Sequence, residues 1–365
     1  MGVVTRRLFP AADDRSDAAR RIAADPVVAD HVTALALPGS NFGIGSLPHL
    51  SAGQAARFSF EAFDIPTIPS LPRRSPAELA VAQALMGVPG VTLGQYGAVA
   101  VDCTGLDPLA EVTTDLDGPQ FIGLRAFLDE AHERHHRDPV KWQFLGPISV
   151  GLALERAGAA TEVAFPAALR AVRSHLVAIA ALIADVLPES PQLVILDEPL
   201  AGGLVGRDFP LAPDDAIDLL SGAMAVLESS ATVGVHSCGN ADVATLLAAG
   251  PHVLSIPVDR GLVSIAGYLD RFLRSGGWIA WGAVATDGPI GVGQPRAWQR
   301  LRSLFCELVQ AGCDGDMLVR QCFITPACGL GTHAPSVARH VAEVLRETSL
   351  SMQSEASTAR FVLGA

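Results

Sequence analysis

Two stretches of the sequence place histidine and cysteine where they could bind a metal ion. His236 and Cys238 are two residues apart at the end of an apolar run, and Cys328 follows a second apolar run in a turn with Gly and Pro. In extended backbone, residues two apart point to the same face, so His236 and Cys238 could share one ion. One imidazole and two thiolates are ligands typical of zinc. A buried cysteine beside a structural histidine is the alternative interpretation of the same spacing.

Other polar residues also follow apolar runs. Ser46 and His49 follow the first such run, and Asp197 ends another, next to Glu198. His49 could donate a proton or contact a substrate; an exposed histidine in a turn is the alternative. For Ser46 and Asp197 the alternatives are a turn and a strand-end cap. Glu198 is expected to point away from Asp197 and to support the fold.

The elements that must position these residues follow a repeated pattern. Eight β-rich runs alternate with Ala- and Leu-rich stretches of helical periodicity, which is typical of βα units around a parallel sheet. The predicted strands are Asn41–Pro48, Ile65–Ser70, Lys141–Ser149, Leu193–Pro199, Thr232–Cys238, Val253–Pro257, Trp278–Val284 and Gln321–Cys328. The helices predicted between and after them include Glu162–Val186 and Pro335–Thr348.

Eight strands favour an α/β fold with a closed (β/α)8 TIM barrel, and a doubly wound open sheet is the alternative. The candidate residues follow their strands, and the carboxyl ends of the strands form the face where barrel active sites are assembled. We expect a single catalytic domain over residues 26–350, an N-terminal arm over residues 1–25 and a C-terminal tail over residues 351–365. The region Val91–Glu111 fits no βα unit and is expected to be an inserted hairpin.

Composition and charge exclude several classes of partner. The formal net charge is −12 and no Lys- and Arg-rich run offsets it, which disfavours nucleic acid and anionic membrane surfaces. The longest apolar helical stretch, Leu176–Leu187, is too short for a bilayer, and the N-terminus lacks a signal-peptide core. We therefore expect a cytoplasmic protein whose six cysteines are reduced thiols.

Five motifs occur in an order that resembles a known family. They are Gly45-Ser46-Leu47-Pro48, Gly146-Pro147, Asp197-Glu198-Pro199, His236-x-Cys238-Gly239-Asn240 and Pro326-x-Cys328-Gly329-Leu330. Together they resemble the catalytic half of cobalamin-independent methionine synthase. More broadly, they resemble its barrel superfamily, which includes the zinc methylcobalamin:coenzyme M methyltransferases and uroporphyrinogen decarboxylase. The resemblance extends from about residue 40 to residue 348 and implies the short, single-barrel form.

The resemblance implies a zinc-dependent methyltransferase that alkylates the sulfur of a small-molecule thiol. His236, Cys238 and Cys328 would bind Zn2+, and the substrate would join them as a thiolate. Asp197 would hold the substrate ammonium group, and Ser46 would contact the amino-acid end of the substrate. The methyl donor would be a folate, a methylcorrinoid that a partner protein could carry, or another small molecule.

Two departures from the family pattern affect this interpretation. At the end of the sixth strand, where the synthase has a glutamate ligand, this chain has Pro257. Asp259 could substitute for that ligand, or the fourth position could stay open for water or substrate. After the second strand, Leu71 and Arg73 stand in a segment where the synthase has an acid for the amino group. This change disfavours homocysteine and favours an anionic substrate that Arg73 could bind.

Two further functions remain open at the level of sequence. A metal-free decarboxylase of the uroporphyrinogen type would use basic residues such as Arg73 and Arg74 and would give the His-x-Cys and Cys motifs no role. A zinc-stabilised barrel without catalysis could act as the partner of a corrinoid protein. The sequence leaves open the identity of the thiol, the fourth zinc ligand and the oligomeric state.

Overall fold

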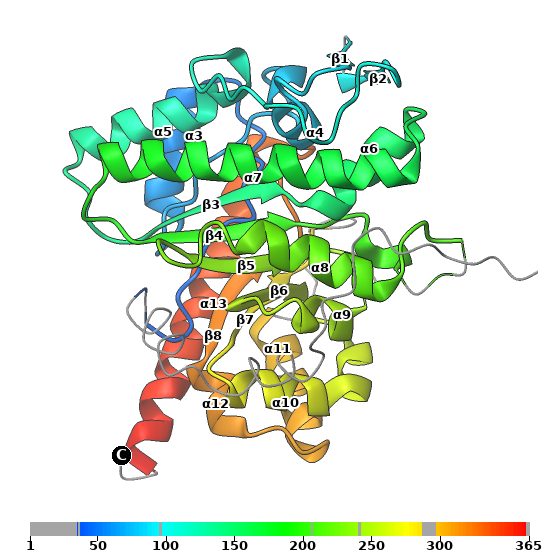
Figure 1. Ribbon diagram of the computed structural model, residues 1–365. Helices are drawn as coiled ribbons and strands as arrows, with labels where there is room; N and C mark the ends of the chain where they lie inside the picture. The colour runs from blue at the N-terminus through cyan, green and yellow to red at the C-terminus, as the bar shows by residue number, and fades with distance from the viewer. Residues whose placement is uncertain are drawn as a thin grey trace, which may run out of the picture.

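The computed structural model describes residues 35, 37–94, 97–204, 206, 208–239, 242–286 and 297–362, the last six as backbone alone. The predicted N-terminal arm and Asn240 lie outside the described residues. Six parallel strands form one curled sheet in the order β3-β4-β5-β6-β7-β8 (Figure 1). They span β3 Val140–Leu145, β4 Gln192–Asp197, β5 Thr232–His236, β6 Val253–Pro257, β7 Trp278–Val284 and β8 Cys322–Pro326.

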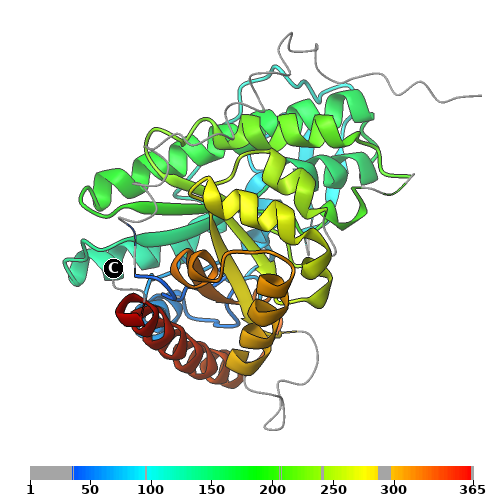
Figure 2. The same ribbon diagram turned by 90° about the horizontal axis from the view of Figure 1, so that it is seen from below.

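Helices cover the outer face of the curled sheet, as the view from below shows (Figure 2). They are α3 Ala52–Ala62, α4 Ala80–Ala84, α5 Ile122–Glu133, α6 Pro147–Arg156, α7 Thr161–Val186, α8 Pro213–Met224, α9 Val243–Ala248, α10 Ala266–Arg274, α11 Ala297–Gln310, α12 Gly315–Arg320 and α13 Pro335–Val362. The 3-10 turns are η1 Pro76–Glu78, η3 Pro119–Phe121, η4 Ala201–Gly203 and η5 Arg260–Ile265. The last helix continues well past Thr348, the predicted end.

Successive side chains of each strand point to opposite faces of the sheet, and this divides the hydrophobic core into two clusters. Side chains such as Ile195 and Val253 join Trp278 and Phe323 in a cluster enclosed by the curled sheet. Their neighbours in sequence belong to the larger cluster that includes the helices. Both faces of each strand are therefore buried, which explains why the strands have nearly continuous apolar sequences.

The first two predicted strands form isolated bridges in place of regular strands. The segment 39–47 pairs with β8 through the bridge Asn41 to Ile324, and Ser46 bridges to Ser70 of the segment 65–70. The segment 65–70 in turn pairs with β3 through the bridge Thr67 to Lys141. Glycines and prolines interrupt both segments: Gly45 has φ +140°, and Pro66 and Pro69 have no N–H to donate.

Four strand ends lie earlier than the sequence predicts, among them that of β4, which ends at Asp197 and not at Pro199. Pro147 occupies the first turn of α6, so β3 ends at Leu145 and not at Ser149. β5 ends at His236 and β8 at Pro326, which leaves Cys238 and Cys328 two residues beyond their strands. The thiols of Cys238 and Cys328 therefore lie in the loops at the carboxyl edge of the sheet.

The predicted hairpin is an antiparallel pair, β1 Val91–Leu93 and β2 Val99–Val101. It belongs to the long segment between the second bridging segment and α5. Within the described part of the chain, one helix, α7, is long and apolar enough to cross a membrane by length and composition, and half of its most apolar window is buried in the protein. The sequence-based argument that the longest apolar stretch is too short for a bilayer is thus wrong, because Leu176–Leu187 mostly belongs to this 26-residue helix.

A buried histidine on α7 makes the stability of the fold depend on pH. His175 has no solvent exposure, its Nδ1 lies 2.8 Å from Thr114 Oγ1, and burial lowers its pKa from 6.5 to about 4. The unfolded chain therefore binds a proton here below about pH 6.5, and the folded chain does not. Acidification from about pH 7.5 to about pH 5 should lower the free energy of unfolding by about 2 kcal/mol through this group.

Urea denaturation of the wild type and of His175→Gln at both pH values measures this contribution. The variant should lose about 2 kcal/mol of the pH dependence, because it has no imidazole to protonate. His132→Gln, which changes an exposed histidine on α5, is the control. An equal pH dependence in the wild type and His175→Gln would contradict the prediction.

Candidate metal centre

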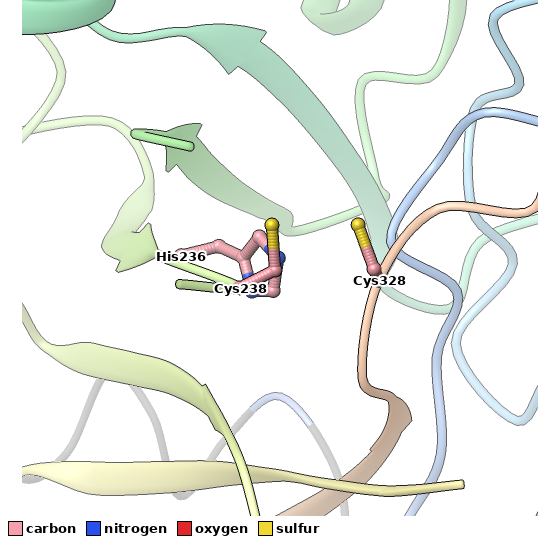
Figure 3. Close-up of side chains that lie close together, drawn as sticks. All are labelled: His236, Cys238 and Cys328. Atoms are coloured by element: carbon pink, nitrogen blue, oxygen red, sulfur yellow. The ribbon is translucent and has the colours of Figure 1, made fainter. Parts of the chain in front are cut away.

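The structure brings the histidine and the two cysteines of the sequence motifs together. The ligand atoms of His236, Cys238 and Cys328 all lie within 4.8 Å of one another (Figure 3). His236 is buried, and both cysteines are partly buried. His236 ends β5 and Cys328 follows β8, so the cluster joins strands that are far apart in the sequence.

Neighbouring strands hold the segment from His236 to Cys238 on both sides. Glu198, just after β4, donates its backbone N–H to the carbonyl of His236 over 2.7 Å. The Ser237 N–H donates to the carbonyl of Ser255 on β6 over 3.1 Å, and the Ser237 hydroxyl donates to the carbonyl of Glu198. These bonds fix the backbone from which both side chains project.

The two ring nitrogens of His236 have different surroundings. Nδ1 lies 2.9 Å from the hydroxyl of Ser255, and Nε2 is buried without a hydrogen-bond partner. A buried polar atom without a partner costs free energy unless it has a ligand. Nε2 is therefore the atom that a metal ion would use.

The two thiols lie close enough to shift each other's pKa in opposite directions. A hydrogen bond from Cys238, together with the nearby imidazole of His236, lowers the pKa of Cys328 to about 4. The same bond to Cys328, together with burial, raises the pKa of Cys238. A thiolate, a second thiol beside it and an unpartnered imidazole nitrogen fit the donor set of a zinc site with three protein ligands.

An acid and a lysine lie near these ligands inside the curled sheet. Asp197 pairs with His236 in the register of β4 and β5, and its Oδ1 is buried without a hydrogen-bond partner. Burial raises the pKa of Asp197 to about 6, against the opposing effects of His236 and Lys141. The Lys141 ammonium donates to the carbonyl of Ile44 and to Gln143 Oε1, and burial lowers its pKa to about 7.

Sequence reasoning missed Lys141. A signal was present, because this lysine stands between Val140 and Trp142 in a strand that is otherwise nearly all apolar. A charged residue at a position predicted to be buried indicates a specific partner. Here the charge partner is Asp197.

Ser46 and Arg73, predicted to bind substrate, contact the loop that follows Cys328. The hydroxyl of Ser46 accepts a hydrogen bond from the N–H of Gly331 over 3.2 Å, and its carbonyl accepts from Leu330 over 2.9 Å. Arg73 is exposed and donates from Nη1 to the carbonyl of His333 over 2.7 Å. Both residues therefore restrain the loop that carries one of the thiols.

The structure does not bring His49 and Asp259 into this cluster. The ring of His49 packs on Phe58 of α3, and its pKa is lowered by burial and by the charge of Arg339 on α13. Asp259 is exposed and caps η5, where its Oδ1 accepts from the N–H of Gly261. Among the described residues, the candidate metal-binding cluster contains neither of them.

Two buried glutamates support the loops around the site. Glu198 is turned toward the first turn of α6 and accepts from the N–H groups of Ile148 and Ser149 and from the Ser149 hydroxyl, as expected for a residue that supports the fold. Glu78 accepts from the N–H of Leu71 and pairs with Arg74. Both carboxylates therefore have hydrogen-bond partners within the protein.

Comparisons with known proteins do not identify a family. No family model and no curated protein matches this sequence. A candidate alpha-L-fucosidase from Bacteroides thetaiotaomicron VPI-5482 has a TM-score of 0.29 and 11% identity, with 62% of this chain and 62% of that chain covered. Bee venom hyaluronidase, in complex with a hyaluronic acid tetramer, has a TM-score of 0.33 and 12% identity, with coverage of 72% and 82%. At these TM-scores neither similarity bears on the function of this chain.

Proposed function

We propose that the protein is a zinc-dependent transferase that moves a methyl or other alkyl group to the sulfur of a small-molecule thiol. The observation that carries this proposal is the cluster of His236, Cys238 and Cys328, whose ligand atoms lie within 4.8 Å of one another. The unpartnered Nε2 of His236 adds to it, because the protein itself leaves this donor free. The sequence resemblance to the methionine synthase superfamily supplies the reaction class.

The proposal includes a closed eight-stranded barrel. The segments 39–47 and 65–70 would be its first two strands, because their bridges connect β8 to β3. Closure would place the ends of β4, β5 and β8 around one mouth, and barrel active sites are assembled there. The reduced thiols of the site also require a reducing compartment, so we propose that the protein works in the cytoplasm.

The side chains near the metal centre would have different roles in the proposed reaction. Zinc bound to His236, Cys238 and Cys328 would lower the pKa of a substrate thiol and keep its sulfur a nucleophilic thiolate at neutral pH. Asp197, with its unpartnered Oδ1, would accept a hydrogen bond from a polar group of the substrate. In the transfer, a sulfur–carbon bond forms, the carbon–donor bond breaks with its electron pair leaving to the donor, and the thiol proton is released.

The surroundings of Asp197 favour a thiol without an amino group. The Lys141 ammonium already attracts the carboxylate of Asp197. A substrate ammonium bound to Asp197 would therefore be repelled by a buried positive charge. The side chain of Leu71 is fully buried in the core and offers no second acid. Arg73 contributes little to this preference, because its guanidinium is bonded to the loop after Cys328.

The metal-free decarboxylase has less support than the transferase. Its basic candidates are engaged within the protein, Arg73 with the carbonyl of His333 and Arg74 with Glu78. A partner role without catalysis differs from the transferase in one measurable property, which is turnover of a thiol.

The test is methylation of a thiol by the zinc-loaded protein. Methylcobalamin and 5-methyltetrahydrofolate serve as donors, with homocysteine and 2-mercaptoethanesulfonate as competing acceptors, and the methylated products are measured by mass spectrometry. We expect a thioether with at least one donor and about ten- to a hundredfold preference for the sulfonate, since each lost charge-assisted bond costs about 1.5–3 kcal/mol. Preference for homocysteine would overturn the substrate assignment, and no thioether in any combination would overturn the transferase.

A further inference from the structure

Ser255 occupies a position on β6 that packing alone does not explain. It is fully buried and lies opposite His236 in the register of β5 and β6. The preceding residue that faces the same way, Val253, belongs to the apolar cluster inside the sheet. A hydroxyl in this place costs free energy unless it has a partner, and its partner is Nδ1 of His236, 2.9 Å away.

We propose that Ser255 is the positioning residue that selects the tautomer of His236 used for metal binding. With the hydroxyl accepting from the Nδ1–H group, the lone pair of the ring is on Nε2, the buried nitrogen without a hydrogen-bond partner. This inference rests on the metal centre of the proposed function. It adds a residue that the sequence motifs do not contain and that acts through His236.

The geometry also allows the side chain to be tested by itself. The carbonyl of Ser255 accepts from the N–H of Ser237, and this backbone bond survives replacement of the side chain. Ser255→Ala therefore removes the hydroxyl and leaves the strand pairing that carries His236 and Cys238. Groups that hold the second nitrogen of a metal-bound histidine typically contribute 10- to 100-fold to metal affinity.

Thr325 on β8 offers a matched control. Its hydroxyl is also buried, has no hydrogen-bond partner and lies three residues before Cys328. Thr325→Val removes a hydroxyl from the same end of the sheet without removing a bond to a ligand. Its zinc affinity should equal that of the wild type.

The experiment measures the Zn2+ dissociation constant of the three proteins by competition with a chelator. We expect Ser255→Ala to bind zinc about 10- to 100-fold more weakly than the wild type. In the 1H–15N spectrum of the zinc-loaded wild type, the Nδ1–H signal of His236, identified by its loss in His236→Gln, should exchange slowly with water and should exchange faster in Ser255→Ala.

The outcomes separate this inference from the proposed function. A wild type that binds no zinc overturns the metal centre and the inference with it. A wild type that binds zinc, together with Ser255→Ala of equal affinity, overturns the role of Ser255 alone. An equal loss in Ser255→Ala and Thr325→Val also overturns that role, because the loss would then come from packing.

Discussion

Cys238→Ala and Cys328→Ala are each expected to lose most of the zinc that the wild type retains, which should be about one ion per chain. Each change removes one of three protein ligands whose donor atoms lie within 4.8 Å of one another. Two remaining ligands hold zinc weakly, so the loss of affinity should exceed the roughly 10- to 100-fold that changes outside the ligand shell cause. Thiol alkylation should be lost in both variants, because the substrate sulfur then has no ion to lower its pKa.

Metal content after dialysis against a weak chelator measures this effect. Cys103→Ala and Cys306→Ala are matched controls, since both change exposed cysteines that lie outside the cluster. They should retain the zinc of the wild type. Equal zinc in all four variants would rule out the proposed ligands, and a loss in the controls as well would show that the effect is not specific to the site.

Glu198→Ala should destabilise the fold by about 3–5 kcal/mol, because it leaves three buried hydrogen-bond donors without their acceptor. The carboxylate has no solvent exposure and accepts from Ile148 N over 2.9 Å, Ser149 N over 2.8 Å and Ser149 Oγ over 2.6 Å. Alanine would leave these donors, which lie in the first turn of α6, buried without partners. This contact joins the end of β4 to the start of α6, so its loss should also loosen the backbone beside His236.

Urea denaturation of Glu198→Ala, Glu198→Gln and Glu189→Ala measures the cost. Glutamine keeps one acceptor oxygen and should lose about 1–3 kcal/mol. Glu189 pairs with Arg137 on the surface, with both side chains more than half exposed, so Glu189→Ala should change stability by less than about 1 kcal/mol. If Glu198→Ala cost no more than Glu189→Ala, the carboxylate would have no structural role.

Much of the site could be predicted from the order of residues along the chain. Alternation with period two fixes which side chains of a strand share a face, and Asp197 and His236 each end an apolar run. Parallel strands bring their carboxyl ends to one edge of the sheet. These two local rules are enough to predict that Asp197, His236 and Cys328 belong to the same edge.

The roles of Ser46, Arg73 and Asp259 could not be predicted in the same way. Each lies at a strand end or in the loop after it, where the residue type permits a substrate contact, a metal ligand or a cap. The structure assigns Ser46 and Arg73 to the loop after Cys328, and Asp259 to the start of η5. For Ser46 and Arg73 the path of the loops decides between these alternatives, and that path depends on contacts between residues more than 250 positions apart. Asp259 instead caps η5 through a local bond to Gly261, two residues away.

The sequence by itself determined the residue types of the proposed metal centre and the edge at which they lie. Only the tertiary structure decided the partners of those residues, among them Ser255 beside His236 and Lys141 near Asp197. The physical reason is that the period of a strand specifies a face, whereas the register between strands is set by the packing of the whole sheet. A shift of β6 by one residue would turn Ser255 away from His236 without changing the pattern of apolar and polar residues in either strand.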